Sequence, residues 1–103
     1  MAGLKDREDG FEKKFAHDAE LKFKAEARRN KLLGLWAAEI MGKSGDDAAA
    51  YAKEVVIADF EEAGDEDVFR KVRGDLDATT SDDTIREMMT SLMGTAIDQI
   101  QSE

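Results

Sequence analysis

The residues able to do chemistry do not converge on a catalytic site. The chain has no cysteine, and its one histidine, His17, stands three residues before Glu20. No second histidine exists to complete a transition-metal shell, although His17 alone could respond to pH. The 24 Asp and Glu residues make chance carboxylate pairs unavoidable, yet no nucleophile, base and orienting group can be named together. We therefore predict a non-enzymatic protein without metal or cofactor.

Two short patterns suggest phosphate or nucleic-acid binding and are better explained otherwise. Gly42 to Ser44 matches the end of a phosphate-binding loop, but Ala37 occupies the position that requires glycine. Basic residues also follow one another over 22–31, but helical spacing spreads them over opposite sides. They are Lys22, Lys24, Arg28, Arg29 and Lys31. We expect no nucleic-acid partner, because the rest of the chain is acidic and would repel phosphate.

The spacing of Phe11 and Phe15 favours protein binding. Residues four apart lie on one side of a helix, and Ala19 continues the row, with Leu4 upstream. Such a row usually faces a core, but it can also enter a hydrophobic groove of a partner. The length of the predicted first helix decides between these readings.

Composition indicates an all-α domain. The 103 residues include no proline and are rich in good helix formers. Net charge is −9, with +2 on residues 1–31 and −11 on residues 32–103. No apolar run is long enough for a membrane span and no signal peptide is apparent, so we expect a soluble, cytoplasmic protein. The charge asymmetry fits a binding segment attached to a solubilising body.

Four helices are predicted from apolar periodicity and from helix start and stop signals. They run from about Gly10 to Met41, from about Ser44 to near Gly64, from about Asp65 to Leu76, and from Thr80 to Ile100. Connections this short favour an antiparallel four-helix bundle.

Local signals mark the predicted helix ends. Gly42 permits the left-handed conformation that closes many helices. Ser44 with Asp47, and Thr80 with Asp83, match the capping box in which a hydroxyl and an acid satisfy backbone amides. These signals predict where the second and fourth helices begin.

The sequence predicts the surroundings of one residue in each of the first two helices. The apolar face of the second helix includes Phe60 and is interrupted by Asp59, which we expect to pair with Arg28 or Arg29 or to reach water at the edge. Trp36 of the first helix is expected to be buried.

The first helix is too long for its own bundle. Its 32 predicted residues span ~48 Å, whereas the other helices span ~18 to 27 Å. Charged residues interrupt its apolar stripe at Lys22, Glu26 and Arg29. We therefore predict a single domain in which residues 1–18 form a mobile arm and residues 19–103 form the bundle.

Nearly the whole chain resembles one known family. The matching segments are FEKKFAHDAELKFKAEARRNKLLGLWAAEIMGK at Phe11 to Lys43, AYAKEVV at Ala50 to Val56, DFEEAGDEDVFRKVR at Asp59 to Arg73, and TIR at Thr84 to Arg86. Together they look like the zeta-type ATPase inhibitor subunit of alphaproteobacterial F-type ATP synthases. Segments of this length are much more specific than a short motif.

The resemblance implies a four-helix bundle whose N-terminal segment enters a catalytic interface of the F1 head. The expected partners are the alpha, beta and gamma subunits, on the cytoplasmic side of the inner membrane, and the free protein is expected to be a monomer. The segment corresponds to about Leu4 to Asp18, with Phe11 and Phe15 as apolar anchors. Polar contacts are implied for Arg7, Lys13, Lys14, His17 and Asp18.

Two departures from the family pattern bear on this expectation. Gly10 replaces a better helix former and the stretch from Asp77 to Asp83 is short. Glycine destabilises a formed helix by ~1 kcal/mol relative to alanine, so weaker inhibition is expected. The alternative function is a small cytoplasmic helical regulator that binds another protein or a small ligand.

Overall fold

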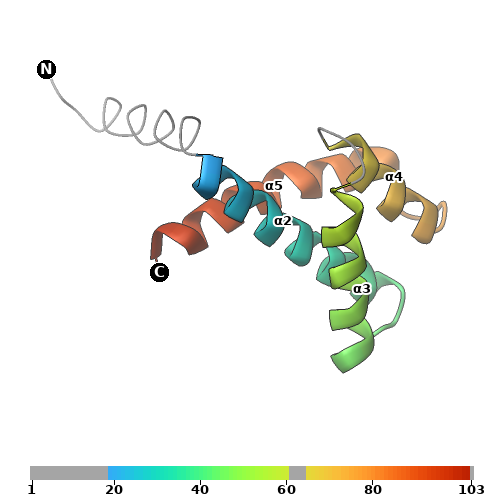
Figure 1. Cartoon of the computed structure of the whole chain (residues 1–103). Coiled ribbons are helices and arrows are strands. Elements are labelled where there is room, and N and C mark those ends of the chain that lie inside the picture. Colours follow the sequence, from blue (N-terminus) through green and yellow to red (C-terminus); the bar gives the residue numbers. More distant parts are fainter. Residues whose placement is uncertain (1–18, 61–64, 103) are drawn as a thin grey trace, which may run out of the picture.

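The computed structural model describes residues 19–60 and 65–102, and these form helices joined by short turns (Figure 1). The helices are α2 (Ala19–Ile40), α3 (Gly45–Ala58), α4 (Glu66–Asp75) and α5 (Asp82–Ser102). The all-α class and the four helices are confirmed. The predicted part of the first helix before Ala19, and the predicted arm, lie outside the described residues.

Helix α2 is the centre of the bundle, and it contacts each of the other three helices. It packs most extensively on α3 and α5, and α5 runs back along it, so that the C-terminal end of the chain lies near the start of α2 (Figure 1). Among the described residues, no helix has the length and apolar character needed to cross a bilayer.

The main core lies where α2, α3, α4 and α5 meet. Leu33 and Ala37 of α2, Val55 of α3, Val68 of α4 and Ile85 of α5 are all fully buried there. Their spacing follows the helical period that the sequence analysis used, because each helix buries one stripe against its neighbours.

Helices α2 and α3 approach closely at Gly34. A Cβ atom on Gly34 would lie 2.5 Å from Ala52 Cα and 3.1 Å from Ala52 Cβ, well inside ordinary van der Waals separation. The absence of a side chain at Gly34 therefore permits the distance at which the two backbones cross.

A second, smaller core holds the start of α2. Ala25 of α2 and Ile100 of α5 are buried in this core. Leu21, Met93 and Ile97 pack around them. Helix α2 is thus attached to α5 within two residues of the first described position.

The end of α2 follows the prediction, whereas the predicted start of α3 needs correction. Gly42 has φ +80°, and the Lys43 amide donates to the Ala38 carbonyl at 2.9 Å, which closes the helix. Ser44 occupies the N-cap position of α3 but its side chain makes no capping hydrogen bond. The predicted capping box with Asp47 is therefore wrong.

The cap of α5 lies one residue later than predicted. The Thr84 amide donates to Ser81 Oγ at 3.1 Å, so Ser81 is the capping residue. Thr80 is buried instead, and its carbonyl accepts a 2.6 Å hydrogen bond from Arg73 Nη1. Thr80 therefore belongs to the turn that Arg73 holds, and its predicted pairing with Asp83 is wrong.

Two predicted core positions also need correction. Trp36 packs against the main core but is only half-buried. Helix α3 ends at Ala58, before the predicted end near Gly64, and Phe60 is 65% exposed. The Phe60 amide donates to the Ile57 carbonyl at 3.0 Å in a tighter turn, which takes its ring off the buried face.

Candidate protein-binding site

The site residues expected from the sequence all precede the described part of the chain. They are Leu4, Arg7, Phe11, Lys13, Lys14, Phe15, His17 and Asp18. Their roles stay predictions. The described residues show what the N-terminal segment is joined to, and which other surfaces are able to bind.

The N-terminal segment joins a helix that is already anchored. Leu21 and Ala25 lie one turn apart on α2 and both pack against the last turns of α5. The residues before Ala19 are therefore joined directly to the packed pair of α2 and α5.

An exposed apolar surface lies beside this attachment point, formed by Phe23, Ile57 and Phe60, and we call it the aromatic corner. The exposed fractions of these residues are 56%, 54% and 65%. The rings of Phe23 and Phe60 are tilted by 33°, with centroids 5.9 Å apart, which is a favourable aromatic contact. Phe23 comes from the second turn of α2, and Phe60 follows α3.

A small, mostly apolar cavity is lined in part by the two rings. It offers a volume of about 10 Å³, enough for about one water molecule. Its lining consists of Phe23, Ala27, Asn30, Val56, Asp59 and Phe60. Rings and polar side chains thus line the same cavity.

Asn30 is the buried polar residue of this cavity. The side chain is 1% exposed, and its Oδ1 accepts a 2.7 Å hydrogen bond from Arg29 Nε. Its amide group acts on the Asp59 carboxylate as a hydrogen-bond donor. Asn30 therefore links the two charged residues on either side of it, as buried polar groups usually require.

Asp59 is the acidic member of the cavity lining. Burial raises the pKa of its carboxyl, and the neighbouring Asn30 amide and the Arg29 charge offset part of this effect. Arg29 does not form the predicted ion pair with Asp59, because its Nη2 donates to Asp65 Oδ1 at 2.8 Å. Asp59 itself is half-buried.

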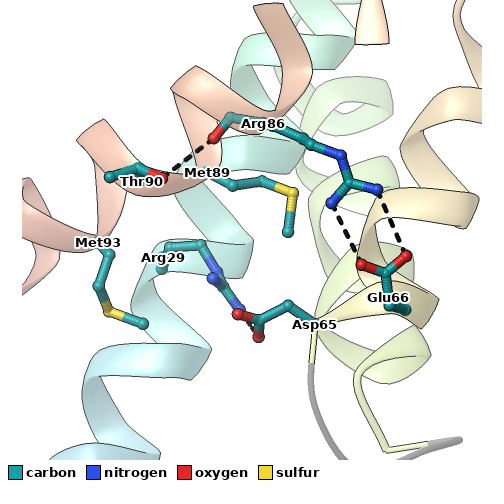
Figure 2. Close-up of a pocket in the computed structure, with 7 residues that line it drawn as sticks. All are labelled: Arg29, Asp65, Glu66, Arg86, Met89, Thr90 and Met93. Carbon is teal, nitrogen blue, oxygen red and sulfur yellow. Dashed lines mark hydrogen bonds and ion pairs between the residues drawn. The ribbon is translucent and has the colours of Figure 1, made fainter. Parts of the chain in front are cut away.

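An open groove with a volume of about 480 Å³ lies between α2, α4 and α5 (Figure 2). It is lined by Arg29, Asp65, Glu66, Arg86, Met89, Thr90 and Met93. Arg86 donates to both carboxylate oxygens of Glu66, at 3.2 and 3.4 Å, and its guanidinium lies 3.9 Å from the ring centroid of Phe69. The side chain of Met89 lies between the two arginines, whereas Met93 lies on the other side of Arg29 from Arg86 (Figure 2).

The charges of this groove are matched within it. Arg29 is 2% exposed and pairs with Asp65, while Arg86 pairs with Glu66. Both pairs join the start of α4 to a neighbouring helix, so the groove is explained as a set of structural contacts. Within residues 19–60 and 65–102, no group of three or more histidine, cysteine or acidic residues is placed to hold a metal ion.

A second ionic cluster ties α3 to α4. Tyr51 Oη donates to Asp75 Oδ2 at 2.9 Å, and Lys71 Nζ contacts Asp75 at 2.9 Å and Glu54 at 3.1 Å. Burial, followed by the hydrogen bond to Asp75, raises the pKa of Tyr51. Burial alone would raise the pKa of Asp75, but the hydrogen bonds from Lys71 and Tyr51 prevail and lower it. This cluster too is structural.

Sequence reasoning missed the aromatic corner. Phe60 was assigned to the apolar face of the second helix, and Phe23 was not singled out. Nothing in the sequence indicated that Asn30 would be buried.

Comparison with known proteins gives two findings. A solved structure determined by NMR in solution is 60% identical in sequence, with a TM-score of 0.75, over 80% of this chain and 96% of that chain. No curated protein matches. The family model described as ATPase inhibitor subunit zeta matches residues 1–99. The all-helical fold, the resemblance of its sequence segments and this match agree, and the chain belongs to the ATPase inhibitor subunit zeta family.

Proposed function

We propose that this protein inhibits ATP hydrolysis by the F1 part of ATP synthase by inserting its N-terminal segment at a catalytic interface. The observation that carries the proposal is the family match, which extends from residue 1 to residue 99 and so includes the segment. The charge difference between residues 1–31 and 32–103 supports separate roles for the two parts.

The body supports the segment mechanically. Helix α2 is fixed to α5 from Leu21 onwards and crosses α3 at Gly34 without an intervening side chain. Residues 1–18 are therefore joined to a base that cannot follow them into a narrow interface. In this proposal residues 19–103 stay outside and the segment acts as a wedge.

The wedge works by favouring one state of the rotary cycle. Phe11 and Phe15 act as apolar anchors in a groove between alpha and beta subunits near gamma, with Leu4 packing at the tip. Arg7, Lys13, Lys14, His17 and Asp18 supply polar contacts. A ligand shifts an equilibrium by its differential affinity for the two states, so the inserted segment stabilises the interface that holds it.

In this proposal the direction of the block is the one that the family resemblance implies. Rotation in the hydrolysis direction must disrupt the bound interface, whereas rotation in the synthesis direction opens it and releases the segment. The protein would act on the cytoplasmic side of the inner membrane, where the F1 head lies, and would be a monomer when free.

The anchors provide the test. Phe11→Ala with Phe15→Ala should weaken inhibition of F1 from the source organism, because each anchor contributes ~1 to 3 kcal/mol at a well-packed interface. Arg7→Glu with Lys14→Glu should mainly change the association rate and its salt dependence. ATPase assays with added protein measure both effects.

Circular dichroism of the same variants is the control. Unchanged melting together with wild-type inhibition by the anchor variant would remove both phenylalanines from the mechanism. Loss of the folded state would instead place Phe11 and Phe15 in the core.

A further inference from the structure

Helix α2 carries a buried polar layer between its two apolar cores. Arg29 and Asn30 are 2% and 1% exposed, and they lie on α2 between Ala25 of the second core and Leu33 of the main core. Arg29 donates hydrogen bonds to Asn30 and to Asp65, so the polar groups of this layer bind one another. The second core is therefore a cluster of its own and does not merge with the main core.

The second core draws its members from one end of each of two helices. Leu21 and Ala25 belong to the first two turns of α2, and Met93, Ile97 and Ile100 belong to the C-terminal half of α5. Only two of these five residues are buried, whereas the main core holds eleven buried residues. Because apolar burial is the main favourable contribution to folding, the second core should open at a lower free-energy cost than the main core.

The C-terminal end of α5 lies beside the start of α2, where residues 1–18 are attached (Figure 1). Ile100 is 8% exposed and is the larger of the two buried side chains of the second core. Phe23 of the same turns of α2 also contacts Phe60, but both rings are more than half exposed, so this contact buries less of each side chain. The packing of Ile100 is therefore the main apolar contact that keeps the start of α2 on the bundle.

We propose that Ile100 is a positioning residue for inhibition, because it closes the second core and so holds the helical start of α2 from which residues 1–18 extend. The inference rests on the proposed function and adds a role for α5, which itself stays outside the interface. When the second core is open, the start of α2 must be ordered at the moment of binding, and the apparent affinity falls with the closed fraction. Inhibitory potency thus depends on a local equilibrium at this end of the bundle.

The test makes the same substitution in the two cores of the full chain. Ile100→Ala removes apolar atoms from the second core, and Ile85→Ala removes the same atoms from the main core at the other end of α5. Amide hydrogen exchange should rise selectively in the first two turns of α2 for Ile100→Ala. Titration of F1 should show a ~10-fold loss of inhibitory potency for this variant, which corresponds to about one closed molecule in ten.

Two comparisons separate positioning from general stability. Folded Ile85→Ala should inhibit as the wild type does, although its melting temperature is lower. Ile100→Leu keeps the volume of the side chain and should retain both the slow exchange and the potency of the wild type. If Ile85→Ala unfolds, Val72→Ala is a milder truncation of a fully buried main-core residue, and Ile100→Val serves in the same way for the second core.

Four results would overturn the proposal. Faster exchange at the start of α2 with wild-type potency removes Ile100 from the mechanism and leaves the proposed function intact. Unchanged exchange in Ile100→Ala shows that the second core does not open separately. An equal loss of potency in a folded main-core variant assigns the effect to overall stability. Failure of the wild type to inhibit removes both the inference and the proposed function.

Discussion

Gly34→Ala should destabilise the bundle although alanine is the better helix former. The new Cβ would lie 2.5 Å from Ala52 Cα, about 1 Å inside an ordinary carbon contact. Its neighbour is backbone, so no side-chain rotation can relieve the overlap and α2 must move away from α3. Severe overpacking of this kind lowers the free energy of unfolding by ~3 kcal/mol. The better helix propensity of alanine raises it by ~1 kcal/mol. We expect a net loss of about 2 kcal/mol.

The same substitution at Gly94 is the control. Gly94 lies inside α5, and a Cβ there meets no atom within 4 Å. Gly94→Ala should therefore stabilise the protein by ~0.5 to 1 kcal/mol through the backbone alone. The same substitution should thus destabilise the protein at Gly34 and stabilise it at Gly94.

Thermal unfolding followed by circular dichroism measures both effects. A change of 1 kcal/mol shifts the Tm of a domain of this size by ~4 to 8 °C, so Gly34→Ala should lower Tm by ~8 to 16 °C. Urea unfolding gives the free energy of unfolding directly. A Gly34→Ala protein as stable as the wild type would show that the helices do not cross at this distance.

Three further stability predictions follow from the caps, the tryptophan and the ionic cluster. Ser81→Ala should lower the free energy of unfolding by ~1 kcal/mol in urea titration, and Ser44→Ala by less, because only Ser81 makes a capping hydrogen bond. Trp36→Ala should lower the free energy of unfolding by ~2 to 3 kcal/mol in the same assay, which is less than the ~3 to 5 kcal/mol for a fully buried ring. A variant as stable as the wild type would contradict the packing of Trp36 on the core. The lowered pKa of Asp75 means that its stabilising effect is present above the unfolded pKa of about 4 and is lost as pH falls through the folded value. Asp75→Asn should therefore destabilise near neutral pH, and its difference from the wild type should shrink below about pH 4; a difference independent of pH would contradict the role of the Lys71 ion pair.

Local signals predicted part of the fold well. Gly42 ends α2 because a left-handed residue is a property of a single position, which glycine alone adopts freely. The apolar periods of the four helices are also local, and the stripes that they mark meet in the core, as Leu33, Val55 and Ile85 show. The number and order of the helices could therefore be predicted.

Features that depend on distant segments could not be predicted. Arg29 is buried because Asp65, 36 residues later, meets it from the start of α4. Ser44 and Ser81 look alike in sequence, but only the second turn places the hydroxyl over the helix. Phe60 fits the periodicity of α3, yet the helix ends two residues before it.

The candidate site also has a part that could be predicted from the sequence and a part that could not. The anchors Phe11 and Phe15 came from their spacing and from the family resemblance, and both precede the described residues. The aromatic corner combines Phe23 with Phe60, which are 37 positions apart, so it required the packing of α2 against α3. Sequence reasoning found the surface that one segment carries and missed the surface that two segments share.

The most direct test of the central claim compares the full chain with residues 19–103 in an ATPase assay on F1 from the source organism. The shortened protein retains both cores and all four described helices, so circular dichroism should show its cooperative melting nearly unchanged. We predict that the full chain inhibits ATP hydrolysis and that residues 19–103 do not. Full inhibition by the folded, shortened protein would contradict the account, because the inhibitory surface would then lie in the bundle.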